Sequence, residues 1–252
     1  AATIAPVYYT LTLEGRDLGG EVFLNDILVD TLDAAERATA TTSINAWVTP
    51  GANQLRIRSL AGRGGAHPPV IRAQVGKRGA DDLGTPEVLT TLQIAPTQPD
   101  AAVDESTTFK VDPAPPSELW SRAQPLRLDG DARAATGNLV RELERAFARR
   151  DAASVTELLG WKTADIARAS FRDQELARTT LRELLDTLFT DPAYTIDYLT
   201  PEALVFELCA NQRLLRVARP TGPAVQIRLS QGGRYRLPLL LARIDGAWKI
   251  AR

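Results

Sequence analysis

Few residues of this sequence have the types that carry out acid–base, nucleophilic or metal chemistry. The chain has one histidine, His67, and one cysteine, Cys209. A metal site with several His or Cys ligands is therefore excluded, and so is an intramolecular disulfide. A Ser-His-Asp triad would depend on His67, which lies in the Gly- and Pro-rich stretch GRGGAHPPV. We expect His67 to be an exposed loop residue and Cys209 to be a small buried apolar side chain.

Two carboxylates could serve as a general base inside a pocket, Asp197 and Glu207. A base in such a place needs burial that raises its pKa and a partner within hydrogen-bonding distance. Asp197 alternates with its neighbours in a predicted strand, and we expect it on the outer face, in solvent. Glu207 has apolar neighbours in VFELC, and we expect it to form an ion pair across strands with Arg216 or Arg228. The phenols that could assist either acid are Tyr194, Tyr198 and Tyr235.

Neither a nucleotide loop nor a nucleic-acid surface is indicated. The segment RGGAH contains several glycines but lacks the lysine and Ser/Thr of a phosphate-binding loop, and a strand pattern follows it. The 30 basic and 31 acidic residues give a formal net charge of −1, so no chain-wide positive field attracts a nucleic-acid backbone. No apolar run reaches the roughly 18 residues of a membrane-spanning helix. We expect no cofactor, no nucleic-acid partner and no membrane-spanning segment.

Three tryptophans stand near segment ends or turns, where large amphipathic rings often serve interfaces: Trp47, Trp120 and Trp161. Packing between domains is the other explanation of these positions. Together with Asp197, Glu207 and Tyr235, the three tryptophans form the set of candidate pocket or interface residues. No catalytic, cofactor-binding or metal-binding residue is predicted.

The elements that must position these residues fall into three zones. Residues 1–96 alternate in period two between turn-forming residues, which predicts an all-β sandwich. Residues 97–128 are rich in Pro, Asp, Ser and Thr, which predicts a linker or a surface wrap. Residues 129–252 begin with helical periodicity and end in strands, which predicts an α+β domain.

Two stretches of the first zone give local detail. In EVFLNDILVDTL, Asn25 and Asp26 tolerate a positive φ and predict a tight hairpin. In INAWVTPGANQLRIRS, Pro50 and Gly51 predict a turn whose backbone Asn53 can satisfy. The alternation LRIR that follows points its leucine and isoleucine inward and both arginines outward.

These two stretches together resemble the galactose-binding-like jelly-roll domain, in which an FLNG-type hairpin precedes a PGxNxLxI strand. The resemblance covers about residues 7–95. Asp26 stands where that pattern has glycine, and Trp47 stands where an aliphatic residue is usual. In the resembling domains this stretch positions sheet edges and carries no reaction.

The third zone predicts helices followed by strands. Residues 131–160 are amphipathic, and Asp151 can cap a second short helix that Gly160 ends. Residues 173–191 repeat the amphipathic pattern and predict a further helix. The strands that follow are joined by predicted hairpin turns, among them the GG pair at 232–233 and the DG pair at 245–246.

Helices followed by a strand meander that ends in RIDGAWKIAR resemble the NTF2-like cone fold, and the resemblance covers about residues 131–252. It implies a curved antiparallel sheet, a pocket between the helices and the concave face, and a largely buried Trp248 that closes the last hairpin. Members that resemble ketosteroid isomerases or dehydratases use an Asp base in that pocket with Tyr, Asp or His partners. The same fold also hosts binders without activity.

The start of the chain, AAT without methionine, is typical of a mature terminus after removal of a signal peptide. A trimmed expression product would look the same. Frequent arginine and alanine indicate a GC-rich bacterial genome. We expect a periplasmic or secreted bacterial protein.

Three functions are compatible with these features. The first, which we predict, is a non-catalytic exported binding protein that acts through protein–protein contacts; one version is an immunity protein that blocks an envelope-targeted toxin. The second is a carbohydrate-binding protein of the cell envelope, suggested by the resemblance of the first zone to sugar-associated jelly rolls. The third is an NTF2-like isomerase or hydrolase that acts on a small apolar molecule.

Overall fold

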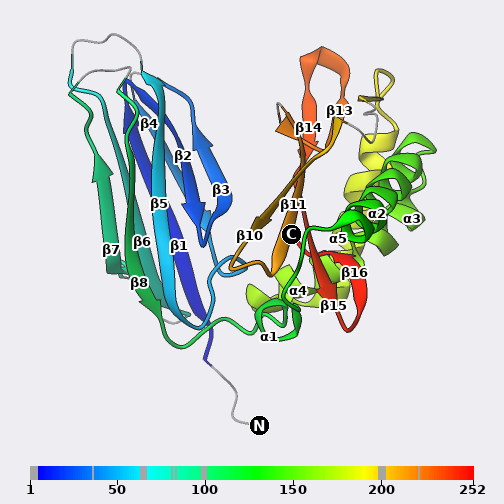
Figure 1. Cartoon of the computed structure of the whole chain (residues 1–252), viewed down its shortest axis with the longest axis horizontal. Coiled ribbons are helices and arrows are strands. Elements are labelled where there is room, and N and C mark those ends of the chain that lie inside the picture. Colours follow the sequence, from blue (N-terminus) through cyan, green and yellow to red (C-terminus); the bar gives the residue numbers. More distant parts are fainter. Residues whose placement is uncertain are drawn as a thin grey trace. The chain divides into compact units, whose positions relative to one another are not determined.

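The computed structural model describes residues 5–35, 37–62, 67–80, 82, 84–97, 101–197, 203–220 and 222–252. The chain divides into two compact units, Ala1–Pro116 and Ser117–Arg252, which we call unit 1 and unit 2 (Figure 1). Tyr198, one of the phenols that could assist the candidate acids, lies outside the described residues. So do residues 1–4, on which the expectation of a processed terminus rests. Each unit is described by itself.

The described part of unit 1 is all-β, as predicted. Its strands form two antiparallel sheets, in the orders β4-β1-β6-β7 and β3-β2-β5-β8. The strand bounds are β1 (Val7–Arg16), β2 (Leu18–Leu24), β3 (Ile27–Leu32), β4 (Ala38–Ser43), β5 (Gly51–Gly62), β6 (Val70–Gly79), β7 (Glu87–Ile94) and β8 (Asp104–Val111).

A single apolar cluster joins the two sheets of unit 1. Tyr9 and Leu11 of β1 and Leu55 and Ile57 of β5 are fully buried in it, because alternate positions of a strand face the same side. The sheets approach closely at Gly20 of β2. A Cβ at this position would lie 2.4 Å from Ile71 Cδ1 and 3.2 Å from Arg58 O, so the buried Ile71 side chain would have to shift to admit it.

The predicted turns of unit 1 are confirmed. Asn25 and Asp26 join β2 to β3 with φ values of 51° and 63°, the conformation of a two-residue hairpin turn. Asn53 is buried, and its amide accepts from Thr49 N at 2.8 Å and donates to Thr49 O at 2.8 Å and to Gly51 O at 3.0 Å. The amide therefore satisfies the backbone of the turn before β5.

The segment predicted as a linker or surface wrap, 97–128, contains a strand. β8 runs antiparallel to β5, from Asp104 opposite Arg58 to Val111 opposite Gly51, and buries Phe109 and Val111 in the core of unit 1. Proline and aspartate on both sides hide this short alternation in the sequence. The division between the units falls at 116/117, and the residues that follow form the short helix α1 (Leu119–Arg122) of unit 2.

Unit 2 continues with four helices: α2 (Gly130–Ala148), α3 (Ala152–Leu158), α4 (Gly160–Ala169) and α5 (Gln174–Phe189). Aspartate side chains cap three of them by accepting a backbone N–H three residues on, Asp129 for α2, Asp151 for α3 and Asp173 for α5. As predicted, the short helix α3 ends just before Gly160. The chain turns at the buried Leu159, and Gly160 begins α4, which the sequence pattern did not reveal.

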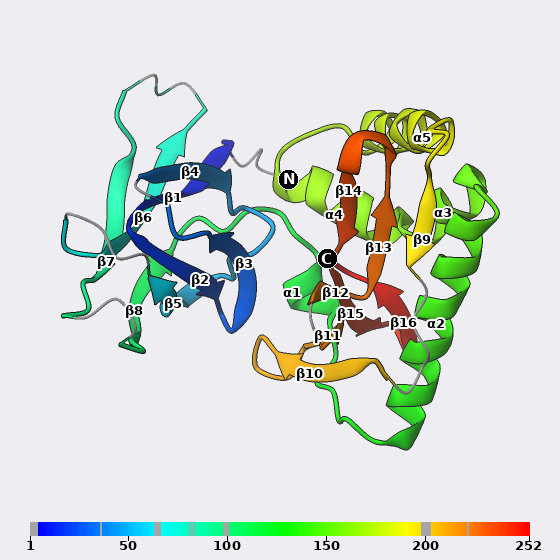
Figure 2. The same ribbon diagram turned by 90° about the horizontal axis from the view of Figure 1, so that it is seen from above.

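The strands of unit 2 form two antiparallel sheets, ordered β14-β13-β9 and β10-β11-β15-β16, and β12 pairs with β11. Their bounds are β9 (Thr195–Asp197), β10 (Val205–Cys209), β11 (Leu214–Arg219), β12 (Gly222–Pro223), β13 (Val225–Arg228), β14 (Arg234–Leu237), β15 (Leu239–Ile244) and β16 (Ala247–Ile250). Helices α2, α3 and α5 lie on one side of the strands (Figure 1), and α2 runs alongside β9 and β16 (Figure 2). No helix in the described part of the chain has the length and apolar character needed to cross a bilayer.

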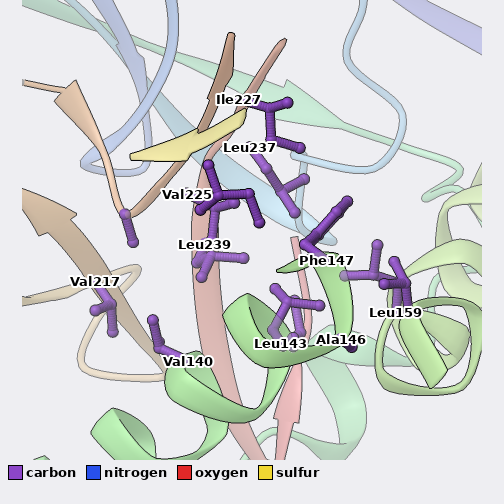
Figure 3. Close-up of a cluster of buried hydrophobic side chains, with 14 of the residues drawn as sticks. Val140, Leu143, Ala146, Phe147, Leu159, Val217, Val225, Ile227, Leu237 and Leu239 are labelled. Carbon is purple, nitrogen blue, oxygen red and sulfur yellow. The ribbon is translucent and has the colours of Figure 1, made fainter. Parts of the chain in front are cut away.

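Apolar side chains occupy the space between α2 and the strands β13 and β15. Val140, Leu143 and Phe147 of α2 are fully buried against Val225 and Leu239 of β13 and β15 (Figure 3). The NTF2-like resemblance implied a pocket in this place. Beside β13 and β15 the described residues form a packed core instead.

Candidate binding groove in unit 2

A hollow of about 260 Å³ lies in unit 2, between the helices and the last strand. Helices α2, α3 and α4 line one side of it, and three consecutive residues of β16 line the other. The lining residues are Leu139, Glu142, Ala146, Arg149, Ser154, Glu157, Leu158, Trp161, Trp248, Lys249 and Ile250. We call this hollow the β16 groove.

The helix caps fix the helical wall of the groove. Asp151 accepts from Ser154 N at 3.0 Å and from Ser154 Oγ at 2.6 Å, which fixes the first turn of α3 directly after α2. Hydrogen bonds from the Ser154 hydroxyl and backbone N–H lower the pKa of the Asp151 carboxyl, so the cap is ionised at neutral pH. Leu159 then anchors the turn into α4, and Trp161 stands in the first turn of that helix.

The strand wall of the groove is a sheet edge. Among the described strands, β16 pairs with β15 alone, with Trp248 opposite Arg243 and Lys249 opposite Ala242. Successive side chains of a strand point to opposite faces. Because Trp248, Lys249 and Ile250 all line the groove, the hollow borders the edge of β16 and not one face of the sheet.

Two half-buried indole rings and four exposed charges give the groove its chemical character. Trp161 and Trp248 lie on opposite walls, and Trp248 also packs against the core of unit 2. Its ring was expected to be largely buried, but it lies at the end of the sheet, where the groove leaves part of it open. The exposed charged residues of the lining are Glu142, Arg149, Glu157 and Lys249, two of each sign.

Helix α4 also carries a buried charged cluster that the sequence did not reveal. Asp165 Oδ2 lies 2.8 Å from Arg252 Nη2, and the two side chains are 1% and 0% exposed. Asp165 also accepts from Ser117 Oγ at 2.6 Å and from Glu118 N at 2.7 Å. These contacts join α4 to the segment before α1 and to the residues after β16.

The electrostatics of this cluster favour a structural anchor. Burial by itself would raise the pKa of Asp165, but the Arg252 charge and the hydrogen bonds from Ser117, Arg252 and Glu118 N lower it below its ordinary value. Burial, reinforced by the Arg252 charge, lowers the pKa of Lys162 from 10.5 to about 8. Asp165 is therefore an ionised and hydrogen-bonded carboxylate, whereas a general base needs a raised pKa.

The two acids predicted as candidate bases lie in ion pairs. Glu207 pairs with Arg216, its register partner on β11, with Nη2 and Oε2 2.9 Å apart, which confirms the predicted cross-strand pair. Asp197 Oδ1 lies 2.9 Å from Arg228 Nη2. Its side chain is half-buried, whereas we expected it in solvent.

Of the predicted phenols, the described Tyr194 and Tyr235 both lie against the apolar core of unit 2. Tyr194 is buried and donates to Phe147 O at 2.8 Å. Tyr235 packs against the apolar core, and burial raises the pKa of its hydroxyl above the ordinary value.

Of the three predicted tryptophans, only Trp161 lines the β16 groove. Trp47 is half-buried and packs against the core of unit 1. Trp120 is buried in α1, where its backbone carbonyl accepts from Arg213 Nη1 at 2.5 Å. Trp248 joins Trp161 in the groove, and the sequence assigned it only a structural role.

The remaining reactive residue types stand apart. Cys209 is buried, as predicted, and its thiol donates to Leu214 O at 3.7 Å. His67 is exposed, also as predicted. Within the described ranges, no group of three or more His, Cys, Asp or Glu side chains could hold a metal ion.

Comparisons with protein-family models, with curated proteins and with solved structures found no match for this chain.

Proposed function

We propose that this chain is a non-catalytic binding protein that acts through protein–protein contacts, and that the β16 groove receives an extended segment of the partner. One observation carries the proposal: two indole rings border a hollow that lies along the edge of β16. Large aromatic side chains in partly open hollows are typical anchors of protein interfaces.

An extended peptide fits this groove better than a small substrate does. The strand edge offers backbone groups to a further strand, and β-strand addition is a common way of binding extended peptides. A volume of about 260 Å³ is below the roughly 300–1,000 Å³ of typical ligand pockets but suits one or two anchoring side chains. Exposed charges of both signs on the lining can select the flanking residues of the segment.

The positions of the acids support a binding role over catalysis. Asp197 and Glu207 are both held by arginines, and the space between α2 and the strands β13 and β15 is filled by apolar side chains. A catalytic carboxylate would need a solvent-excluded pocket and a raised pKa.

The finer fold and the cellular setting belong to the same proposal. We assign unit 1 to the jelly-roll-like sandwiches and unit 2 to the NTF2-like cones. The two four-stranded sheets of unit 1 and the order of helices and strands in unit 2 support this assignment. The proposal includes an exported bacterial protein, whose partner would be a protein of the cell envelope, such as a toxin that the chain blocks.

Site-specific photo-crosslinking tests the groove. A photoreactive amino acid replaces Glu157 on the groove lining or, as a control, Leu176 on α5, which is 65% exposed and outside the groove. Irradiation in the bacterial envelope should give one protein adduct from position 157 and none from position 176. Equal adducts from both positions would show that the partner does not use the groove.

A binding measurement with the purified partner completes the test. Trp161→Ala should weaken the affinity by at least about tenfold, as interface anchors do. Glu207→Gln, which changes an exposed ion pair outside the groove, should leave the affinity unchanged. An unchanged affinity in Trp161→Ala, or turnover of a small molecule that Glu207→Gln abolishes, would overturn the proposal.

A further inference from the structure

Unit 1 has a hollow of its own, of about 710 Å³, on the outer face of the sheet β4-β1-β6-β7. The described side chains that line it are polar or aliphatic, and no Phe, Tyr or Trp is among them. The polar lining residues are Glu14, Arg16, Arg37, His67, Arg72 and Gln93. We call it the arginine pocket.

Strand register brings the arginines together. In β1, Glu14 and Arg16 alternate with the buried Leu13 and Gly15, so they point away from the core. Glu14 lies opposite Arg72 of β6, and Arg72 lies opposite Gln93 of β7. Arg37 enters from the segment before β4. Among the described residues of the lining, three guanidinium groups thus share one hollow with a single carboxylate.

One buried guanidinium donor of the arginine pocket lacks an acceptor among the described residues. Arg16 Nη2 donates to Pro68 O at 3.3 Å, but Arg16 Nε is buried and has no hydrogen-bond partner among the described residues. Arg72 Nη2 donates to Gln74 Oε1 at 3.0 Å, whereas its Nη1 lies 3.8 Å from Glu14 Oε2, which is too far for a hydrogen bond. A buried donor without a partner is costly, and an anionic acceptor in the hollow would remove that cost.

We propose that the arginine pocket binds a small organic molecule that carries two or more carboxylate or phosphate groups. The planar fork of a guanidinium matches the oxygens of both groups. The three positive charges of the described arginines also exceed the single negative charge of Glu14. The volume exceeds that of a single inorganic anion and lies in the usual range for small-molecule ligands, roughly 300–1,000 Å³. Since the whole chain has a formal net charge of −1, the positive charge is a property of this pocket. The proposal does not depend on the function proposed for unit 2.

Calorimetric titration of the full chain at low salt tests the pocket with four probes: citrate, glucose 6-phosphate, inorganic phosphate and glucose. Citrate or glucose 6-phosphate should bind with a Kd below about 1 mM. Binding of citrate alone assigns the pocket to carboxylates, and binding of glucose 6-phosphate alone assigns it to phosphates. If neither binds below about 10 mM, or if glucose binds as well as its phosphate, the proposal is wrong.

Variants then locate the binding. Arg16→Gln and Arg72→Gln should each weaken the affinity for the probe that binds by at least about tenfold, and added salt should weaken that affinity further. Arg78→Gln is the matched control, because Arg78 is an exposed arginine of the same strand as Arg72 and does not line the pocket. Arg37→Gln provides a further variant on an exposed segment if either strand substitution prevents folding. Equal loss in Arg78→Gln would show a nonspecific charge effect and overturn the proposal.

Discussion

Arg252 and Asp165 form an ion pair, with Nη2 and Oδ2 2.8 Å apart, in which neither side chain reaches solvent. The pair joins the residues after β16 to α4, and Ser117 and Glu118 add hydrogen bonds from the start of unit 2. Breaking such a pair leaves an uncompensated buried charge. Removing both charges avoids that cost.

We therefore predict that Arg252→Met destabilises the protein by about 3–5 kcal/mol, and that Arg252→Met with Asp165→Leu costs less than the single change. Urea unfolding followed by tryptophan fluorescence measures both, because three of the four tryptophans lie in unit 2. If the double variant lost as much as the two single variants together, the charges would not be coupled.

The pH dependence of Lys162 follows from its lowered pKa. The folded protein releases this proton near pH 8, whereas the unfolded chain holds it to about pH 10.5. The unfolded state therefore binds more protons between these values, and stability attributable to Lys162 rises with pH across the window. At pH 7 the charged, half-buried ammonium destabilises the fold.

Lys162→Met should accordingly raise stability at pH 7 by about 1–2 kcal/mol, and the gain should vanish as the pH approaches about 10. Thermal unfolding at a series of pH values measures the effect. Lys110→Met, at an exposed position of β8, is the control and should change little at any pH. A gain in Lys162→Met that does not depend on pH would contradict the assigned cause.

Gly20 gives a test of the packing between the sheets of unit 1. A Cβ there would lie 2.4 Å from Ile71 Cδ1, so Gly20→Ala should cost about 1–3 kcal/mol by overpacking the core. Gly79→Ala is a matched control, because nothing lies within 4 Å of a Cβ at that position. Denaturant unfolding should separate the two variants, and equal stabilities would show that the sheets do not meet at Gly20.

Phe109 distinguishes a strand from a linker in the segment 97–128. Its ring is buried by β8 in the core of unit 1, so Phe109→Ala should cost about 3–5 kcal/mol. The neighbouring Lys110 is exposed, and Lys110→Ala should cost less than about 0.5 kcal/mol. A negligible cost at Phe109 would restore the linker interpretation.

Trp248 and Phe147 should respond differently to truncation. Phe147 is fully buried, and Phe147→Ala should cost about 3–5 kcal/mol, as in a packed core. Trp248 is half-buried beside the β16 groove, so Trp248→Ala should cost about 1–2 kcal/mol, roughly half as much, because part of the ring is already in solvent. Chemical unfolding measures both, and equal losses would mean that the ring is fully buried in solution.

The features that the sequence predicted correctly depend on local physics. Asn25 and Asp26 adopt a positive φ because their short polar side chains tolerate it, and that preference is visible in the sequence. The inward and outward alternation of LRIR and the capping of α3 by Asp151 follow from strand period and from hydrogen bonds within a few residues. The Glu207–Arg216 pair was foreseeable because both residues occupy predicted neighbouring strands.

The features that the sequence missed depend on which distant segments meet. Asp165 and Arg252 are 87 residues apart, and each looks like an ordinary surface charge until α4 and the residues after β16 enclose both of them. β8 is a strand because the edge of β5 is available for pairing, which overrides the proline and aspartate around it. The β16 groove needs three helix segments and a sheet edge at one place, and residue types alone do not fix such an arrangement. The sequence therefore determined turns, caps and strand faces, whereas tertiary packing decided burial, charge pairing and the hollows where a ligand could bind.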